Sequence, residues 1–305
     1  MTYREPEFMP WDGRRVPITF VGGYLGAGKT TAINEVLAHA HRPIAVIVND
    51  VGSIDIDASL VRRRHGDTIE VADGCVCCTS IDGLGAAFDQ IRARATPPDH
   101  VIVELSGVAE PDRMLPWGRS AGFLLDGVVV VVAADQLVPG ALPDWVHLQL
   151  TSQIASADLL VLTKTDLVHD AGADARRRLA EIAPHSPVFT GGRDTVEQGA
   201  VGRFLALGGR HPGGPAAVSR STLFDAHEVD LVEVPGPVTR DELDVWLLEM
   251  PSPPGRRIVR AKGIVDTADD GLVLVQVVGD RREITAVPDP ERQPPTDLVV
   301  ISLAV

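Results

Sequence analysis

The chain has 305 residues, which is long enough for one large α/β domain together with a smaller domain. It carries 28 lysines and arginines against 42 aspartates and glutamates, so its formal net charge is −14 at pH 7. Such an acidic chain disfavours a broad electrostatic grip on nucleic acid or on an anionic membrane, and we expect neither as a partner. The composition, with 45% hydrophobic and 23% charged residues, is that of a folded globular protein.

Residues 1–15 mix charges with proline and glycine and contain no apolar core of a secretory signal. The longest apolar run, Val128–Ala134, is too short to span a bilayer. We therefore expect a cytoplasmic protein in which residues 1–15 form an N-terminal extension.

Strand-like and helix-like segments alternate through the first two thirds of the chain. Short runs rich in Val and Ile are typical of buried parallel strands. The strands expected are Val16–Val21, Ile44–Val48, Thr68–Val71, Val101–Val103, Val128–Val132, Leu159–Leu162 and Pro187–Phe189, and the helices include Lys29–Ala40, Gly83–Ala95 and Ala173–Ile182. This alternation predicts a doubly wound α/β domain with a mostly parallel sheet over residues 16–207.

A second, smaller α+β unit is expected over residues 218–305. Glycine and proline crowd residues 208–217, which predicts a linker there. In the second unit a helix is predicted to begin at a capping box formed by Thr239 and Glu242, and Pro251 is expected to stop it. The strand segments around it are Asp230–Val234, Arg257–Val265, Leu272–Val278, Glu283–Val287 and Leu298–Leu303.

The strongest chemical signal is a G-x-x-x-x-G-K-[ST] segment between a strand and a helix. Its glycines let backbone amides turn towards phosphate oxygens, and the helix N-terminus adds its dipole. Lys29 is expected to neutralise the β and γ phosphates and the Thr30 hydroxyl to hold Mg²⁺. The expected nucleotide contacts come from Gly23, Gly26, Ala27, Gly28, Lys29, Thr30 and Thr31. The alternative is a glycine-rich turn without a ligand.

A candidate base-reading loop, Thr163-Lys164-Thr165-Asp166, follows the expected strand Leu159–Leu162. Guanine-specific P-loop proteins carry Asn-Lys-x-Asp at this place. The Asp166 carboxylate can accept the N1 and N2 hydrogens of guanine, and the Lys164 stem can cover the base. The alternative is a polar loop in which Asp166 caps the next helix. Thr163 departs from the pattern, and its hydroxyl is expected not to bridge loops as an amide does.

Two further segments are candidates for nucleotide-dependent switching. Glu104 ends a strand where a P-loop fold places a second acidic residue near Mg²⁺, and the Gly107 amide is expected to approach the γ-phosphate. The alternative for Glu104 is a carboxylate satisfied by a neighbouring helix. The acidic segment Asn49–Asp57 supplies Asp50, which can reach Mg²⁺, the attacking water or a nearby metal; the alternative is a solvated acidic loop.

All three cysteines lie in the run Cys75-Val76-Cys77-Cys78. This clustering points to a thiol site and away from a disulfide framework. Thiolates suit Zn²⁺ and related late transition metals, but three of them in four residues do not readily close a tetrahedron. A fourth ligand must come from elsewhere, such as Asp50, a partner protein or water, and such an open site suits metal transfer. The alternative is a group of small buried hydrophobes.

These motifs together resemble the CobW family of P-loop GTPases, relatives of the HypB and UreG metal-insertion GTPases. The resemblance is carried by Gly22–Thr31, Gly74–Thr79, Glu104-x-Ser106-Gly107-x-x-x-Pro111, Gln153 with Ala157-Asp158, and Arg260–Gly263 in the C-terminal unit. The chain departs from the family where Asn49–Ser53 stands in place of the usual Asn-Glu-Phe-Gly-Glu, and where a His-rich tract is absent. Metal storage is therefore not expected.

The resemblance implies a GTP-hydrolysing metallochaperone that passes its metal to a client metalloprotein or cofactor pathway. Lys29, Thr30, Glu104 and Asp50 would serve hydrolysis, with Mg²⁺ bound, and the nucleotide contacts would include Gly107, Thr163, Lys164 and Asp166. The transition metal would be held by Cys75, Cys77, Cys78 and Asp50. Zn²⁺ is the first expectation, and Co²⁺ or Fe²⁺ are family alternatives.

Two other classes of function remain open from the sequence. A small-molecule kinase would use the same phosphate loop but would need an acceptor, so GTP turnover without an acceptor argues against it. A non-catalytic metal sensor would use nucleotide only for stability, so metal-dependent turnover argues against that reading. The oligomeric state does not follow from the sequence.

Overall fold

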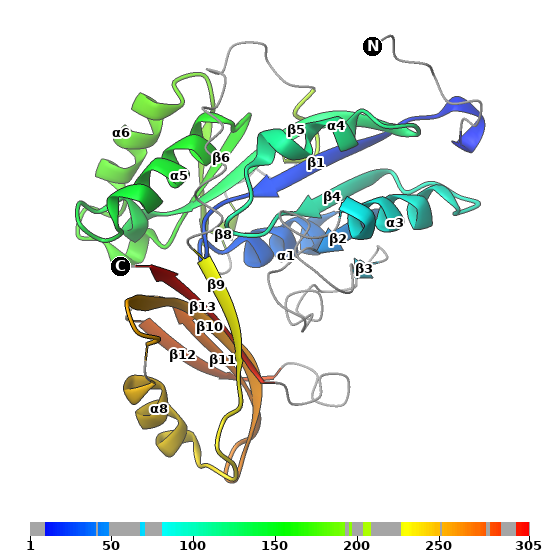
Figure 1. Ribbon diagram of the computed structural model, residues 1–305. Helices are drawn as coiled ribbons and strands as arrows, with labels where there is room; N and C mark the ends of the chain where they lie inside the picture. Colours follow the sequence, from blue (N-terminus) through cyan, green and yellow to red (C-terminus); the bar gives the residue numbers. More distant parts are fainter. Residues whose placement is uncertain are drawn as a thin grey trace. The chain divides into compact units, whose positions relative to one another are not determined.

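The computed structural model describes residues 10–40, 42–48, 68–70, 81–192, 195–196, 204–208, 227–250, 252–278, 281–287 and 297–304. The described residues up to 208 form one compact unit, and those from 227 onwards form a second (Figure 1). The proposed linker 208–217 lies outside the described residues except for Gly208, so the domain boundaries remain predictions.

The first unit is built on an eight-stranded sheet in the order β3-β2-β4-β1-β5-β6-β7-β8. The strands are β1 (Val16–Gly22), β2 (Ile44–Val48), β3 (Thr68–Glu70), β4 (His100–Glu104), β5 (Phe123–Ala133), β6 (Leu159–Thr163), β7 (Val188–Gly192) and β8 (Thr195–Val196). Every neighbouring pair from β3 to β7 is parallel, and β8 pairs with β7 in the antiparallel sense. The predicted α/β fold with a mostly parallel sheet is therefore confirmed.

The strand order places a ligand-binding edge next to β1. The chain leaves β1 towards β2 on one side, whereas β5, β6 and β7 follow in order on the other side. Ligands in open α/β sheets bind at such a reversal point, outside the carboxyl ends of the strands. The loop after β1 and the loop after β4 both begin at this edge, because Val21 pairs with Glu104.

Helices connect these strands in the first unit (Figure 1). They are α1 (Lys29–His39), α3 (Ile81–Arg92), α4 (Leu115–Gly118), α5 (Asp144–Ala155) and α6 (Ala173–Ile182), with 3₁₀ turns at Pro10–Gly13, Pro111–Met114, Ala134–Leu137 and Thr165–Leu167. The predicted bounds of α6 and the predicted start of α1 are confirmed. The observed α1 ends one residue before the predicted end, and α3 begins two residues and ends three residues before the predicted bounds. The sequence reading did not single out α5, whose buried face includes two glutamines.

β5 begins at Phe123, five residues before the predicted strand Val128–Val132. Asp126 and Gly127 interrupt the apolar pattern, yet both lie inside the strand, where the pairing with β1 shifts register between Ile18 and Thr19. The Asp126 carboxylate is buried, and it accepts hydrogen bonds from the backbone amides of Leu207 and Gly208 at 3.0 and 2.9 Å. A polar residue fits a central strand here because its oxygens are satisfied.

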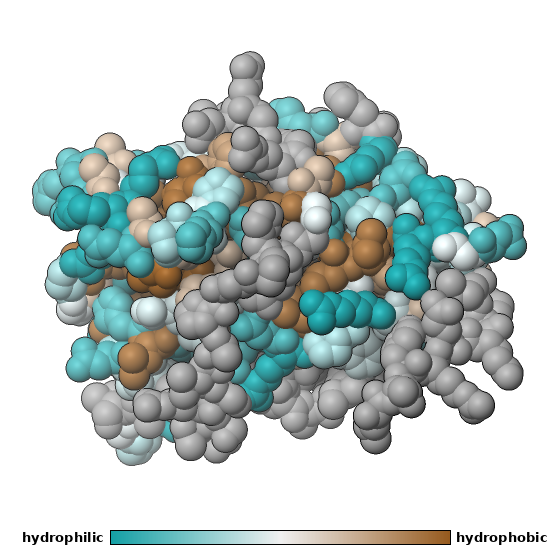
Figure 2. All heavy atoms as spheres, turned by 90° about the horizontal axis from the view of Figure 1, so that it is seen from above, coloured by the Kyte–Doolittle hydropathy of each residue, from teal (hydrophilic) through white to brown (hydrophobic). Residues whose placement is uncertain are grey.

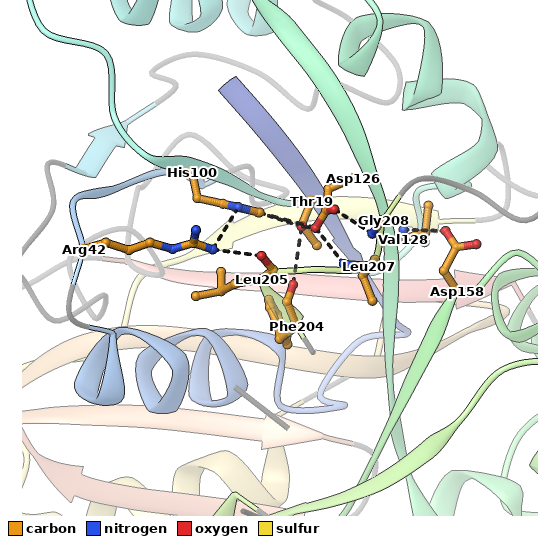
Figure 3. Close-up of polar contacts among 10 residues, drawn as sticks. All are labelled: Thr19, Arg42, His100, Asp126, Val128, Asp158, Phe204, Leu205, Leu207 and Gly208. Carbon is orange, nitrogen blue, oxygen red and sulfur yellow. Dashed lines mark hydrogen bonds and ion pairs between the residues drawn. The ribbon is translucent and has the colours of Figure 1, made fainter. Parts of the chain in front are cut away.

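Asp126 belongs to a buried polar network at the centre of this unit (Figure 3). The Thr19 hydroxyl lies 2.8 Å from Nε2 of His100 and 3.3 Å from Oδ2 of Asp126. Arg42 donates to the carbonyl oxygen of Leu205 at 2.8 Å. Burial lowers the pKa of His100 to about 4, against the opposing pull of Asp126. The network therefore holds a neutral imidazole at pH 7 and ties residues 204–208 to the sheet.

The second unit is a five-stranded antiparallel sheet in the order β12-β11-β10-β13-β9, with one helix. Its elements are β9 (His227–Val232), α8 (Arg240–Glu249), β10 (Arg256–Thr267), β11 (Gly271–Val278), β12 (Arg281–Ala286) and β13 (Leu298–Ala304). Leu243 and Leu247 of α8 pack with Val275 and Val300 of the sheet. The helix begins at the predicted capping box, which is confirmed. The backbone amide of Glu242 donates to the Thr239 hydroxyl, and the backbone amide of Thr239 donates to the Glu242 carboxylate.

The surface drawn in Figure 2 shows apolar side chains between hydrophilic ones. Within the described part of the chain, no helix is long and apolar enough to cross a membrane.

Candidate functional site

The loop between β1 and α1 adopts a conformation that requires glycine. Gly23 has φ +133°, and a Cβ there would lie 2.2 Å from the carbonyl oxygen of Val131. Gly28, with φ +96°, stands at the N-cap of α1, and no side chain of the described residues caps this helix. A helix that begins at a glycine in this way presents its N-terminal amides and the positive end of its dipole to the loop, which suits anion binding.

Lys29 is folded back over this loop. Its side chain is buried, and its Nζ donates to the carbonyl oxygen of Gly23 at 3.0 Å. A buried ammonium is costly unless it is paired, so its location beside the loop amides concentrates positive charge where a phosphate would bind. Thr31 is exposed in the first turn of the same helix, and Ala27 is buried.

Thr30 and Glu104 meet at the carboxyl edge of the sheet. The Thr30 hydroxyl donates to Oε1 of Glu104 at 2.9 Å, and Glu104 is 3% exposed at the end of β4. This contact is compatible with both predictions for Glu104. It is a bond to a neighbouring helix, α1, and it also places the carboxylate beside the hydroxyl that is expected to hold Mg²⁺. A hydroxyl and a carboxylate are the oxygen donors that Mg²⁺ prefers, so the pair fits that ion.

Thr163 joins the base-reading loop to the phosphate loop. Its hydroxyl donates to the carbonyl oxygen of Ala27 at 2.6 Å and lies 3.3 Å from that of Val132. The expectation that a hydroxyl would not bridge these loops is wrong. The carboxyl ends of β6 and β1 bring the two loops close enough for a short side chain to reach, which the sequence does not reveal.

Asp166 is exposed on the 3₁₀ turn Thr165–Leu167, after Lys164 in a left-handed conformation with φ +54°. It does not cap α6. The cap is supplied by Asp170, whose carboxylate accepts hydrogen bonds from the amides of Gly172 and Asp174. The Asp174 amide in particular lowers the pKa of Asp170. The alternative role of Asp166 as a cap for this helix is therefore wrong.

The loop after β4 packs directly on the phosphate loop. A Cβ at Gly107 would lie 2.6 Å from the side chain of Leu25 and 2.8 Å from its backbone nitrogen. Gly107 is therefore required for close approach of the two backbones. Whether its amide meets a phosphate remains a prediction.

Three buried glutamines secure these two loops, and sequence reasoning assigned no role to any of them. Gln136 donates to the carbonyl oxygen of Leu25 at 2.7 Å, Gln149 to that of Val108 at 2.6 Å, and Gln153 to those of Gly107 and Ala109 at 3.2 and 2.8 Å. A signal was available for two of them. Gln149 and Gln153 are spaced i, i+4 among Val146, Leu150 and Ile154, which places polar groups on a buried helix face.

The proposed transition-metal ligands Asp50, Cys75, Cys77 and Cys78 lie outside the described residues. Within the ranges that are described, no group of three or more His, Cys, Asp or Glu side chains could hold a metal ion. The thiol site remains a prediction from the sequence.

Comparison with known proteins agrees with the fold and the motifs. Residues 17–190, more than half of the chain, match the family described as CobW/HypB/UreG, nucleotide-binding domain. Residues 231–304 match the Cobalamin synthesis protein cobW C-terminal domain.

Curated relatives and a solved structure are similar to the chain. The zinc chaperone CobW of Sinorhizobium sp. is 29% identical over 289 residues, which cover 84% of this chain and 79% of that protein. The zinc-regulated GTPase metalloprotein activator 1 of Schizosaccharomyces pombe is 32% identical over 165 residues, covering 50% of this chain and 40% of that protein. The crystal structure of Zn(II)-bound YjiA GTPase from E. coli aligns with 22% identity over 95% of both chains, with a TM-score of 0.46.

Proposed function

The chain belongs to the CobW/HypB/UreG family, and on that premise we propose that it is a GTP-hydrolysing metallochaperone. It binds a transition metal, with zinc as the first candidate, and passes the metal to a client metalloprotein or cofactor pathway. Hydrolysis of GTP is coupled to the transfer of the metal to this client.

The observation that carries the nucleotide half of this proposal is that two separate parts of the chain converge on one loop: the end of β4 with the loop that follows it, and the end of β6. Glu104 reaches Thr30, Thr163 reaches Ala27, and Gly107 packs on Leu25. Phosphoryl transfer requires mainly positioning and electrostatic stabilisation, so a phosphate loop held by contacts at Thr30, Ala27 and Leu25 suits it.

Each group at the proposed nucleotide site has a role that follows from its chemistry. The backbone amides at Gly26 and Gly28, together with Lys29, bind the phosphates. Thr30 and Glu104 would hold Mg²⁺, which supplies charge neutralisation at the phosphates when bound. Asp166 accepts the N1 and N2 hydrogens of guanine.

Three further residues complete the nucleotide site. Gly107 senses the γ-phosphate through its amide, and Lys164 covers the face of the guanine base. Asp50 lies in sequence between the phosphate loop and the cysteines, where it can serve either the nucleotide or the metal.

The metal half rests on the cysteine cluster and on the relatives. Cys75, Cys77 and Cys78 provide thiolates, and Asp50 is the candidate fourth ligand. Zinc is preferred over Co²⁺ or Fe²⁺ because thiolates with one oxygen donor suit it, and because the Sinorhizobium relative is named a zinc chaperone. The Schizosaccharomyces relative is named a metalloprotein activator, which supports a metalloprotein client.

The test is metal affinity by competition titration, with Zn²⁺ and Co²⁺ in the presence of Mg²⁺, on protein loaded with GDP or with a non-hydrolysable GTP analogue. We expect affinity to differ by about tenfold or more between the two states, equivalent to about 1.4 kcal/mol of coupling. The Cys77→Ser variant should lose tight binding. Equal affinity in both states, or tight binding by the variant, would contradict the proposal.

A second measurement separates the proposal from the other classes of function. Phosphate release from GTP without an added acceptor is expected, and it should respond to the metal that binds best. Formation of GDP only with an acceptor, with the phosphoryl group on the acceptor and not free in solution, would favour a kinase. Phosphate release that ignores the metal would favour a passive sensor.

A further inference from the structure

The loop after β4 is held by side chains from α5 through three consecutive carbonyl groups. Gln153 donates its amide to the carbonyl oxygens of Gly107 and Ala109, and Gln149 donates to that of Val108. Gln153 is 0% exposed and Gln149 is 2% exposed. Both hydrogens of the Gln153 amide are thus used on one short stretch of backbone.

These contacts determine which way the loop amides point. In a trans peptide the C=O and N–H of one plane point in opposite directions. The Ser106 carbonyl accepts from the Ala109 amide at 2.9 Å, so the plane that it shares with the Gly107 N–H is fixed. Gln153 fixes the next plane through the Gly107 carbonyl at 3.2 Å.

The same loop lies against the phosphate loop, because Gly107 packs on Leu25. Removing the glutamine amides would leave three buried carbonyl groups without these donors, and the loop would move to find others. A loop free to rotate its peptide planes cannot keep the Gly107 amide aimed in one direction.

We propose that Gln149 and Gln153 are positioning residues that hold the loop 106–109 with the Gly107 amide aimed at the γ-phosphate, and thereby set the preference for GTP over GDP. This inference rests on the proposed GTPase function. Neither glutamine touches the nucleotide; both act through the loop backbone.

The test compares nucleotide affinities and turnover for the full chain and three variants. Gln153→Met and Gln149→Met keep the length of the side chain and remove its donor. Gln136→Met is the matched control, since Gln136 is also buried and donates to a carbonyl, but to that of Leu25 in the phosphate loop. The probes are a fluorescent GDP and a non-hydrolysable GTP analogue, with Mg²⁺ present.

Gln153→Met should bind the GTP analogue about tenfold more weakly while its GDP affinity changes by less than about twofold, and its kcat should fall more than its KM rises. Gln149→Met, which loses one hydrogen bond, should change in the same direction by less. Gln136→Met should weaken both nucleotides by a similar factor.

Equal losses for GDP and the GTP analogue in Gln153→Met, or no loss for either, would overturn the inference while leaving the proposed function standing. If Gln153→Met does not fold, as judged by its thermal transition, the affinity ratio of Gln149→Met decides in the same way. Absence of nucleotide binding by the unmodified chain would overturn the proposed function, and the inference with it.

Discussion

The hydroxyl of Thr163 donates a 2.6 Å hydrogen bond to the carbonyl oxygen of Ala27, and so joins the loop after β6 to the loop after β1. The two residues are separated by 136 positions in the chain. One side chain therefore couples the loop proposed to read the base to the loop proposed to bind the phosphates.

Thr163→Val should weaken GDP binding by about five- to tenfold, because the isosteric side chain leaves the Ala27 carbonyl without its donor, a loss of about 1 kcal/mol. Isothermal titration with GDP measures the effect. Thr163→Ser keeps the hydroxyl and should retain most of the affinity. Full affinity in Thr163→Val together with a loss in Thr163→Ser would show that the methyl group, not the hydrogen bond, matters.

Gly23→Ala should abolish nucleotide binding and lower the thermal transition of the protein. The added Cβ would meet the Val131 carbonyl oxygen at 2.2 Å, in a backbone conformation that L side chains rarely adopt. Gly140→Ala is the control, since Gly140 also has a positive φ, of +78°, but an added Cβ there has no atom within 4 Å. The control should bind nucleotide normally; binding by Gly23→Ala would refute the steric argument.

Asp166→Asn should change the nucleotide preference of the protein from guanine to xanthine. In the proposed role, the carboxylate would accept from the N1 and N2 hydrogens of guanine, whereas an amide can donate to the oxygen that xanthine carries at C2. We expect the affinity for GDP to fall on the order of 100-fold and that for XDP to rise. Asp170→Asn, in the same exposed region but bonded to the α6 amides, should leave the preference unchanged.

His100 should make the first unit less stable as the pH falls. Its pKa is about 4 in the folded chain against 6.5 for an exposed histidine, because burial disfavours the charged ring. Between those values the unfolded state binds the extra proton, so this contribution is complete above pH 6.5 and is lost as the pH falls towards 4. The loss should be on the order of 2 to 3 kcal/mol at pH 4.5.

Urea unfolding at pH 7.5 and 4.5 measures this loss. His100→Gln removes the titrating group, so its free energy of unfolding should change less with pH than that of the unmodified chain. His39→Gln changes an exposed ring on α1 and should leave the full pH dependence in place. If His100→Gln and His39→Gln show the same pH dependence, burial of His100 does not control it.

The order of elements along the chain could be predicted because it is written in local patterns. The apolar runs of β2 and β6, the helix α6 and the capping box at Thr239 each depend on residues within a few positions of one another. The glycines of the phosphate loop belong to the same class, since backbone conformation at Gly23 and Gly28 is a local property.

The start of β5 could not be predicted, since Asp126 and Gly127 read as a break in an apolar run. Only the folded chain supplies the backbone amides of Leu207 and Gly208 that satisfy the Asp126 carboxylate. The spacing of the glutamines in α5 indicates a buried polar face, but their partners could not be predicted because these lie more than 40 residues away.

The sequence by itself predicted the type of chemistry, because the residue types in the phosphate loop, the proposed base-reading loop and the cysteine cluster would act through adjacent positions. The tertiary structure decided how the described parts of that machinery are joined: Thr163 to Ala27, Thr30 to Glu104, and Gln153 to the Gly107 loop. These contacts arise from the order of strands in the sheet, which brings distant loops to one edge. Hydrophobic periodicity specifies which segments are strands but not which strands become neighbours.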